Sequence, residues 1–135
     1  MIRVAAGILR RGNRLLVCQR RRGGPFPLRW EFPGGKLKPG ESAESALCRE
    51  LREELAVDAP PEELRKLEVV RHRYPQGPDV EIHFFAVEGF SGDPANLSFE
   101  AIAWVEPAEL KRFDFLEADR PLVARIAARG VVSPE

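Results

Sequence analysis

The chain has 135 residues, which is enough for one packed core, and it carries 21 basic and 21 acidic side chains. This balance excludes a strong overall field for nucleic acid or an anionic membrane, and no apolar run reaches membrane-spanning length. Cys18 and Cys48 are isolated, without the spacing of a metal or redox motif, which suits a reducing compartment. The N-terminus lacks the hydrophobic region of a signal peptide. We therefore expect a single domain over residues 1–135 in the cytoplasm, with no nucleic-acid or membrane partner.

The first half of the chain predicts two strands, a long loop and a helix. Residues 2–10 and 14–19 are apolar and β-prone, and Arg11-Gly12-Asn13 between them forms a hairpin-like turn. A loop over 20–34 ends in Trp30 and a glycine pair. The helix is expected over about 42–56, and Asp58-Ala59-Pro60-Pro61 stops it.

The second half predicts three strands and a final helix. Strands are expected near 67–74 and 80–89, on either side of a proline-rich turn, and again at 101–105 after a loop over 91–98. A turn begins at Pro107, and the last helix covers about 119–128. His72 and His83 are scattered and are read as surface or half-buried strand residues. The order of elements indicates an α/β (α+β) fold, with a mixed β-sheet sandwiched between α-helices.

The helix over 42–56 carries an unusual set of acids. Ser42 is a suitable N-cap, and a buried stripe recurs every four residues, at Ala43, Leu47, Leu51 and Leu55. Glu50, Glu53 and Glu54 stand at i, i+3 and i+4, within an arc of about 100° that borders this stripe. We therefore expect all three acids at the edge of a packed surface, not pointing straight out to water.

Such a cluster has two interpretations. The first is a solvated face whose acids pair with Arg49 and Arg52. The second is a site for a hard divalent cation, which prefers oxygen ligands. The second is favoured because neighbouring like charges repel unless a cation offsets them, and because a glycine-rich segment, Trp30-Glu31-Phe32-Pro33-Gly34-Gly35, lies before the acids.

These residues resemble the Nudix box of the Nudix hydrolases, G-x5-E-x7-R-E-U-x-E-E-x-G-U, where U is aliphatic. The matching positions are Gly35, Glu41, Arg49, Glu50, Leu51, Glu53, Glu54 and Val57. The second glycine of the pattern is Ala56 here, which places the sharpness of the turn in question more than the chemistry. The segment 30–35 and the opening Val4-Ala5-Ala6-Gly7-Ile8-Leu9 are further similar to the MutT branch of the family.

The resemblance implies the Nudix fold and a hydrolase that attacks nucleoside triphosphates, giving monophosphate and pyrophosphate. It implies Mg²⁺ or Mn²⁺ held by Glu50, Glu53, Glu54 and the carbonyl of Gly34. Glu53 is our preferred acceptor for the proton of the attacking water, and Arg49 should orient Glu41 and the ligand acids. The sequence does not separate a monomer from a homodimer.

The resemblance also implies a substrate-binding set, formed by Arg20, Glu31, Phe32, Pro33, Gly34, Lys36 and Asp119. Lys36 or Arg20 would meet phosphate oxygens, Phe32 would border the base, and Asp119 would read its edge. An ionised aspartate only accepts hydrogen bonds, so Asp119 would favour donors such as the amino group of cytosine, or would read 8-oxoguanine if it is protonated. The alternatives are that Asp119 is only the N-cap of the last helix, and that Arg20-Arg21-Arg22 is a plain basic loop.

The chain departs from the pattern before its late strand, where a MutT-like glutamate is replaced by Ser98. Glu100 is the nearest acid, read either as a further metal ligand or as a solvated residue at the strand entry.

Three functions remain open. The leading one is a pyrophosphohydrolase of oxidised purine nucleotides such as 8-oxo-dGTP, and the others are a hydrolase of CTP or other pyrimidine triphosphates and a non-catalytic Nudix-fold binding module.

Overall fold

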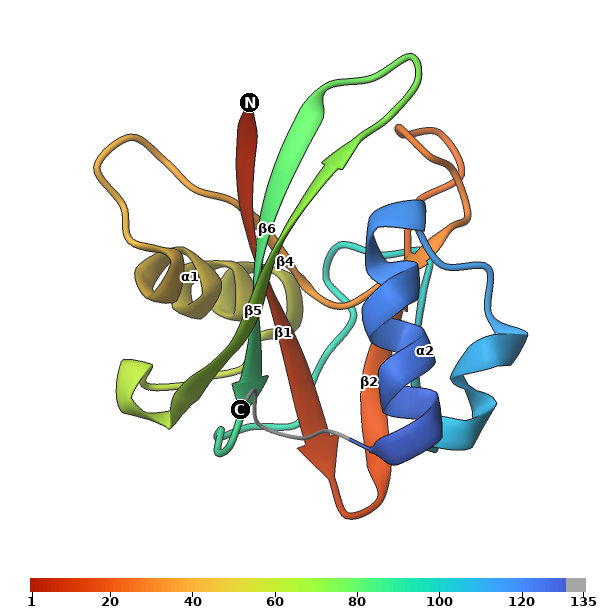
Figure 1. Ribbon diagram of the computed structural model, residues 1–135. Coiled ribbons are helices and arrows are strands. Elements are labelled where there is room, and N and C mark those ends of the chain that lie inside the picture. The colour runs from red at the N-terminus through yellow and green to blue at the C-terminus, as the bar shows by residue number, and fades with distance from the viewer. Residues whose placement is uncertain (131–135) are drawn as a thin grey trace.

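The computed structural model describes residues 1–130, which form a mixed sheet with a helix on each face (Figure 1). The strands are β1 (Ile2–Arg11), β2 (Arg14–Gln19), β3 (Trp30–Glu31), β4 (Gly34–Lys36), β5 (Leu64–Arg73), β6 (Asp79–Val87) and β7 (Ala101–Val105). The helices are α1 (Ala43–Leu55) and α2 (Arg120–Arg129), with 3-10 turns η1 (Pro61–Glu63), η2 (Pro107–Arg112) and η3 (Glu117–Asp119).

β1 is the central strand of the sheet. It runs parallel to β6, from Ile2 opposite Val80 to Leu9 opposite Val87, and antiparallel to both β2 and β4. β5 extends the sheet beyond β6, while β3 and β7 both pair with β2. The parallel pair requires a long crossover, and the segment that makes it contains α1. This connection therefore places the acidic helix against the sheet.

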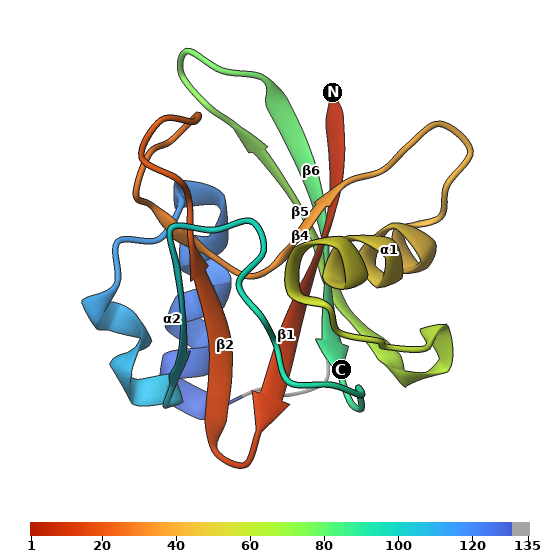
Figure 2. The same ribbon diagram turned by 180° about the vertical axis from the view of Figure 1, so that it is seen from behind.

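Alternation along the strands divides the core into two layers. One face of the sheet packs against α1 and the other against α2, which lie on opposite sides of the sheet (Figure 2). The α1 layer includes Ala5, Leu9, Leu16 and Phe85 from the strands, and the α2 layer includes Ala6, Ile8, Leu15 and Phe84. Neighbouring residues of β1, β2 and β6 thus point to opposite layers, as the period of a strand requires. The expected sheet between helices is confirmed.

The structure corrects several expected boundaries. The loop over 20–34 contains β3 and the start of β4, two short strands whose pairing partners are distant in sequence. β5 begins and ends earlier than predicted, β6 ends at Val87, and the turn at Pro107 is the 3-10 turn η2. The last helix starts at Arg120, one residue later than expected, because residues 117–119 form η3. Short strands depend on long-range hydrogen bonds, so local patterns do not reveal them.

Candidate active site

The start of α1 follows from its sequence. The Oγ atom of Ser42 accepts a hydrogen bond from the backbone amide of Ser45 at 3.1 Å, so the predicted N-cap is confirmed. The predicted stripe is also buried, and Ala46 joins it. This packing fixes the rotation of α1 about its axis, and with it the direction in which the acids project.

The helix α1 ends in a tight turn at Ala56, where the family pattern has a glycine. Ala56 adopts the left-handed conformation, with φ 56° and ψ 34°. The backbone amide of Ala56 donates a hydrogen bond to the carbonyl of Arg52 at 3.1 Å. The backbone amide of Val57 donates one to the carbonyl of Leu51 at 3.3 Å. These two bonds satisfy carbonyls at the helix end. The doubt raised by the missing glycine is resolved in favour of a tight turn, achieved by a strained alanine.

The glycine pair brings backbone close to the acids. Gly34 and Gly35 pair with Ala6 and Ala5 of β1. A Cβ atom on Gly35 would overlap the carboxylate of Glu50, so only glycine permits this approach. The main chain of β4 and the first helix acid therefore share one small space.

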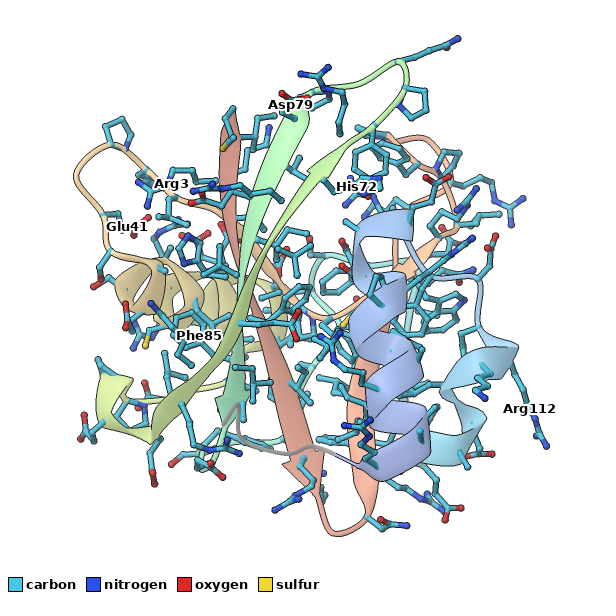
Figure 3. The ribbon with its side chains drawn as sticks, viewed as in Figure 1. Arg3, Glu41, His72, Asp79, Phe85 and Arg112 are labelled. Atoms are coloured by element: carbon cyan, nitrogen blue, oxygen red, sulfur yellow. The ribbon has the colours of Figure 1, made fainter. Side chains whose placement is uncertain are left out.

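Arg49 organises the acids around it. Its Nε and Nη2 atoms donate to the two oxygens of Glu41 at 2.8 and 2.9 Å, a bidentate pair. Its Nη1 donates to Glu50 at 2.8 Å and to Glu53 at 3.3 Å, and Nη2 also reaches the carbonyl of Lys36 at 3.0 Å. Glu41 lies just before the N-terminal end of α1 (Figure 3). These contacts agree with the expected orienting role of Arg49, which stays a prediction.

The hydrogen bonds of Glu41 also affect its protonation. The Arg49 side chain, followed by the backbone amide of Lys38, lowers the pKa of Glu41 from 4.5 to about 2. Glu41 is therefore ionised at neutral pH, and it holds Arg49 in place as a fixed negative charge.

Glu54 differs from the other helix acids. Its Oε1 atom is buried and has no hydrogen-bond partner among the described residues. Burial, followed by the charges of Glu50 and Glu31, raises the pKa of Glu54 from 4.5 to about 8, although a backbone hydrogen bond from Gly34 acts in the opposite direction. A buried acceptor without a donor is unfavourable in the free protein. A cation bound at this oxygen would satisfy it.

The prediction that all three acids avoid solvent is wrong for Glu53. Its side chain is 54% exposed, whereas that of Glu50 is 16% exposed. Glu53 lies farther from the stripe and reaches outward to Arg49, one turn earlier in the helix. Within residues 1–130, no group of three or more His, Cys, Asp or Glu side chains is gathered closely enough to hold a metal ion.

A second cluster of charges lies at the other end of the site. Arg20, which follows β2, pairs with Glu31 of β3 at 3.0 Å and also donates to the carbonyl of Pro25 at 2.8 Å. Asp119 is only 4% exposed and stands at the N-cap position of α2, as expected, but its side chain makes no capping hydrogen bond to the helix. Its carboxyl group instead receives a hydrogen bond from the backbone amide of Phe32.

An aromatic cavity borders this cluster. It has a volume of about 300 Å³ and is lined by residues that include Phe26, Tyr74, Leu116 and Glu117. The ring centroids of Phe26 and Tyr74 lie 4.8 Å apart. The Tyr74 hydroxyl accepts a hydrogen bond from the backbone amide of Ala118 at 3.3 Å. The sequence analysis missed both aromatic residues. No local motif marks them, since Phe26 lies in the loop after β2 and Tyr74 lies just after β5.

Comparison with known proteins identifies the family. The family model of the NUDIX domain matches residues 1–126. This chain belongs to the Nudix family. The chain is 35% identical over 135 residues to a CTP pyrophosphohydrolase of Escherichia coli, covering 99% of this chain and 97% of that protein. It is 29% identical over 126 residues to an 8-oxo-dGTP diphosphatase of the same organism, covering 93% and 95%.

Solved structures agree with this Nudix assignment. The solution structure of the E. coli ORF135 protein has a TM-score of 0.80 and 33% identity, covering 98% of this chain and 95% of that one. A MutT structure, from a study of the Aliivibrio salmonicida and Vibrio cholerae proteins, has a TM-score of 0.79 and 29% identity, covering 95% and 98%. No helix among residues 1–130 of this Nudix chain is long and apolar enough to cross a membrane.

The other predicted residues of the Nudix site occupy varied environments. Phe32 and Pro33 are buried, and the Phe32 ring packs against Phe84 and Phe115 in the α2 layer. Lys36 is exposed at the end of β4. Their expected contacts with substrate stay predictions.

The two positions before the late strand contact a basic loop. Glu100 is exposed beside the start of β7, where its Oε1 atom accepts the backbone amide of Arg22 at 3.4 Å. The carbonyl of Ser98 accepts a hydrogen bond from the side chain of Arg21 at 2.9 Å. These contacts agree with the interpretation of Glu100 as a strand-entry residue, while its role as a metal ligand stays untested.

Proposed function

We propose that this chain is a metal-dependent pyrophosphohydrolase of nucleoside triphosphates, with residues 1–135 acting as one Nudix domain. The observation that carries the proposal is the buried, unpartnered oxygen of Glu54, next to Glu50 and the backbone of the glycine pair. A purely structural helix face gains nothing from an acid in this state, because burying a carboxyl oxygen without a hydrogen-bond donor destabilises the fold. The Arg49 network further supports a site prepared for a charged ligand.

Four groups would hold Mg²⁺ or Mn²⁺. They are the carboxylates of Glu50, Glu53 and Glu54 and the carbonyl oxygen of Gly34, all hard oxygen donors of the kind these ions prefer. When bound, the ion neutralises negative charge on the phosphates and makes a water molecule more acidic. The unpartnered oxygen of Glu54 fits such an ion, since the ion supplies the missing partner.

The side chains of the site then have separate roles. Glu53 accepts the proton of the attacking water, and its exposure gives it access to solvent for that step. Arg49 holds Glu41 and Glu50 in defined orientations, while the three helix acids must still move closer to one another to share an ion. Lys36 and Arg20 contact phosphate oxygens, although Arg20 must also retain its pair with Glu31.

Two substrates are supported by different observations. An oxidised purine triphosphate such as 8-oxo-dGTP is the leading candidate, because Asp119 is buried beside Phe32 at the place expected to read a purine edge. A pyrimidine triphosphate is the second, because the relative with 35% identity is named a CTP pyrophosphohydrolase. In either case we propose a cytoplasmic monomer or homodimer.

A nucleotide panel tests the proposal directly. The protein is incubated with Mg²⁺ and each of 8-oxo-dGTP, dGTP, CTP and dCTP, and pyrophosphate release is measured. We expect release with 8-oxo-dGTP as the best substrate, whereas a preference for CTP would replace the leading candidate by the second. No release from any nucleotide would overturn the enzyme assignment and favour a binding module. Calorimetry showing no uptake of Mg²⁺ or Mn²⁺, even with nucleotide, would overturn the metal site.

A further inference from the structure

The loop between β6 and β7 is bound to the end of α1. The backbone amides of Ala95 and Leu97 donate hydrogen bonds to the carbonyls of Leu55 and Glu54, at 2.8 and 3.1 Å. These carbonyls belong to the last turn of α1, where the helix has no amide of its own to offer them. Figure 2 shows this segment running between α1 and β2. The loop therefore lies against the helix end that carries Glu53 and Glu54.

The side chain of Asn96 fixes the shape of this loop. Its Oδ1 atom accepts hydrogen bonds from the backbone amides of Phe99 at 2.8 Å and Ser98 at 3.3 Å. Its Nδ2 atom donates to the carbonyl of Phe99 at 2.9 Å. Asn96 itself is exposed, whereas Phe99 is buried in the α1 layer. Asn96 therefore contributes hydrogen bonds to the turn and little buried surface.

The first peptide unit that Asn96 holds also reaches Arg21. The peptide bonds of residues 1–130 are trans, so the N–H and C=O groups of each planar unit point in opposite directions. Asn96 binds the Phe99 amide, and the carbonyl of Ser98, in the same unit, therefore points away from Asn96. This carbonyl accepts a hydrogen bond from the Nε atom of Arg21 at 2.9 Å.

The next peptide unit reaches the end of β2. Asn96 binds the carbonyl of Phe99, so the amide of Glu100 points to the far side, where it donates to the carbonyl of Gln19 at 2.9 Å. The side chain of Glu100 adds a contact there, since it accepts the backbone amide of Arg22 at 3.4 Å. One asparagine thus directs two peptide units toward the chain at the end of β2.

That chain continues as the arginine loop, residues 20–29, which borders the other part of the site. Arg20 pairs with Glu31 at 3.0 Å, and Phe26 lines the aromatic cavity. Asn96 therefore stands between two parts of the site. One is the end of α1 with its acids, and the other is the loop expected to contact the nucleotide.

Resting on the proposed function, we propose that Asn96 is a positioning residue, which holds the arginine loop in register with the acids of α1. Its three hydrogen bonds all go to the backbone of its own loop, so it acts through the contacts that this loop makes on either side. A substrate bound at two places reacts fastest when their spacing is already correct, and a misplacement of about 1 Å can slow turnover about 100-fold. Loss of Asn96 should therefore lower kcat while each part of the site keeps its own binding strength.

Asn96→Ala tests this role with the best substrate of the nucleotide panel. We expect kcat for pyrophosphate release to fall by about 10-fold or more, while KM and the calorimetric affinity for Mn²⁺ each change by less than about 3-fold. Asn13→Ala is the matched control, since Asn13 is an exposed asparagine that bonds Glu106 at 3.3 Å in the turn after β1. It should leave kcat unchanged. Asn96→Asp keeps both accepted bonds and should recover most of the lost rate, and a rate no higher than that of Asn96→Ala would contradict the proposal.

Arg21 and Arg22 provide a second, charge-matched comparison. The loop contacts use the side chain of Arg21 but the backbone amide of Arg22. Arg21→Met should therefore lower kcat, and Arg22→Met should not. Combining Arg21→Met with Asn96→Ala should give the rate of Asn96→Ala alone, because both changes remove the same contact. Effects that multiply would show that the two residues act independently, and the inference would be wrong.

Amide hydrogen exchange provides a readout that requires no turnover. In Asn96→Ala, exchange should become faster at the amides of Arg22 and Leu28 in the arginine loop, although neither residue touches Asn96. Faster exchange confined to residues 95–100 would show a purely local role and overturn the inference. Wild-type activity that persists in full in Asn96→Ala would also overturn it and leave the hydrolase assignment intact. No pyrophosphate release by the wild-type protein would instead remove the hydrolase assignment and this inference together.

Discussion

Ala56 carries the backbone strain that ends α1, so replacing it with glycine should stabilise the protein. The residue has φ 56° and ψ 34°, where the Cβ atom of an L-residue lies too close to its own carbonyl oxygen. Its side chain is exposed, so removing one methyl group sacrifices little buried apolar surface. Both hydrogen bonds that close the helix are made by backbone atoms and persist in the variant.

The size of the effect follows from two opposing terms. An L-residue in the left-handed region costs roughly 1–2 kcal/mol, which glycine removes. Glycine makes the unfolded chain more flexible, which destabilises the folded state by roughly 0.5–1 kcal/mol. The difference spans about 0–1.5 kcal/mol, so we expect Ala56→Gly to raise the free energy of unfolding by about 0.75 kcal/mol, equivalent to a rise in Tm of about 2–4 °C for a chain of this size.

Urea denaturation and calorimetry measure this change, and Ala124→Gly is the control. Ala124 is an exposed residue within α2, where the backbone is right-handed. The same substitution should there lower the free energy of unfolding by about 1 kcal/mol. If both substitutions changed the free energy of unfolding in the same direction, the argument from backbone conformation would be refuted. Activity should be unchanged in Ala56→Gly, because the turn that follows Glu53 and Glu54 keeps its geometry.

The remaining predictions concern the acids and their partners. Glu53→Gln should lower turnover by at least about 100-fold while the protein stays folded. Glu44→Gln, in the first turn of the same helix and outside the Arg49 network, should not lower it; equal rates in the two variants would mean that the proton acceptor is elsewhere. Arg49→Lys keeps the charge but loses the fork that holds Glu41, so kcat should fall about 10-fold or more; full activity would show that the orientation of the acids is unimportant. Hydrogen bonds from His83, then Arg71, lower the pKa of Glu81 from 4.5 to about 2. The ionised form therefore stabilises the fold above about pH 4.5, and this contribution is lost as pH falls toward about 2. Glu81→Gln should destabilise the protein at neutral pH by an amount that shrinks over this range, and a difference in urea stability that does not vary with pH would contradict it.

Local interactions explain why the arrangement of the acids on α1 follows largely from the sequence. The N-cap at Ser42, the buried stripe of α1 and the spacing of Glu50, Glu53 and Glu54 all depend on residues within a few positions of one another. Helix geometry converts such spacing directly into a shared face. Even the departure at Ala56 was visible, although its left-handed conformation was not.

Tertiary structure decided how these groups are protonated and exposed. Glu54 is buried and unpartnered because the glycine strand and Glu31 approach it from distant parts of the chain, while Glu53 reaches solvent. The side chain of Asp119 makes no capping hydrogen bond because η3 turns it toward the Phe32 amide. Tyr74 and Phe26 meet only after β5 and the loop after β2 are in place. The sequence by itself thus determined the family and the order of the acids along α1. Burial and long-range electrostatics, which depend on the whole fold, determined the state of each one.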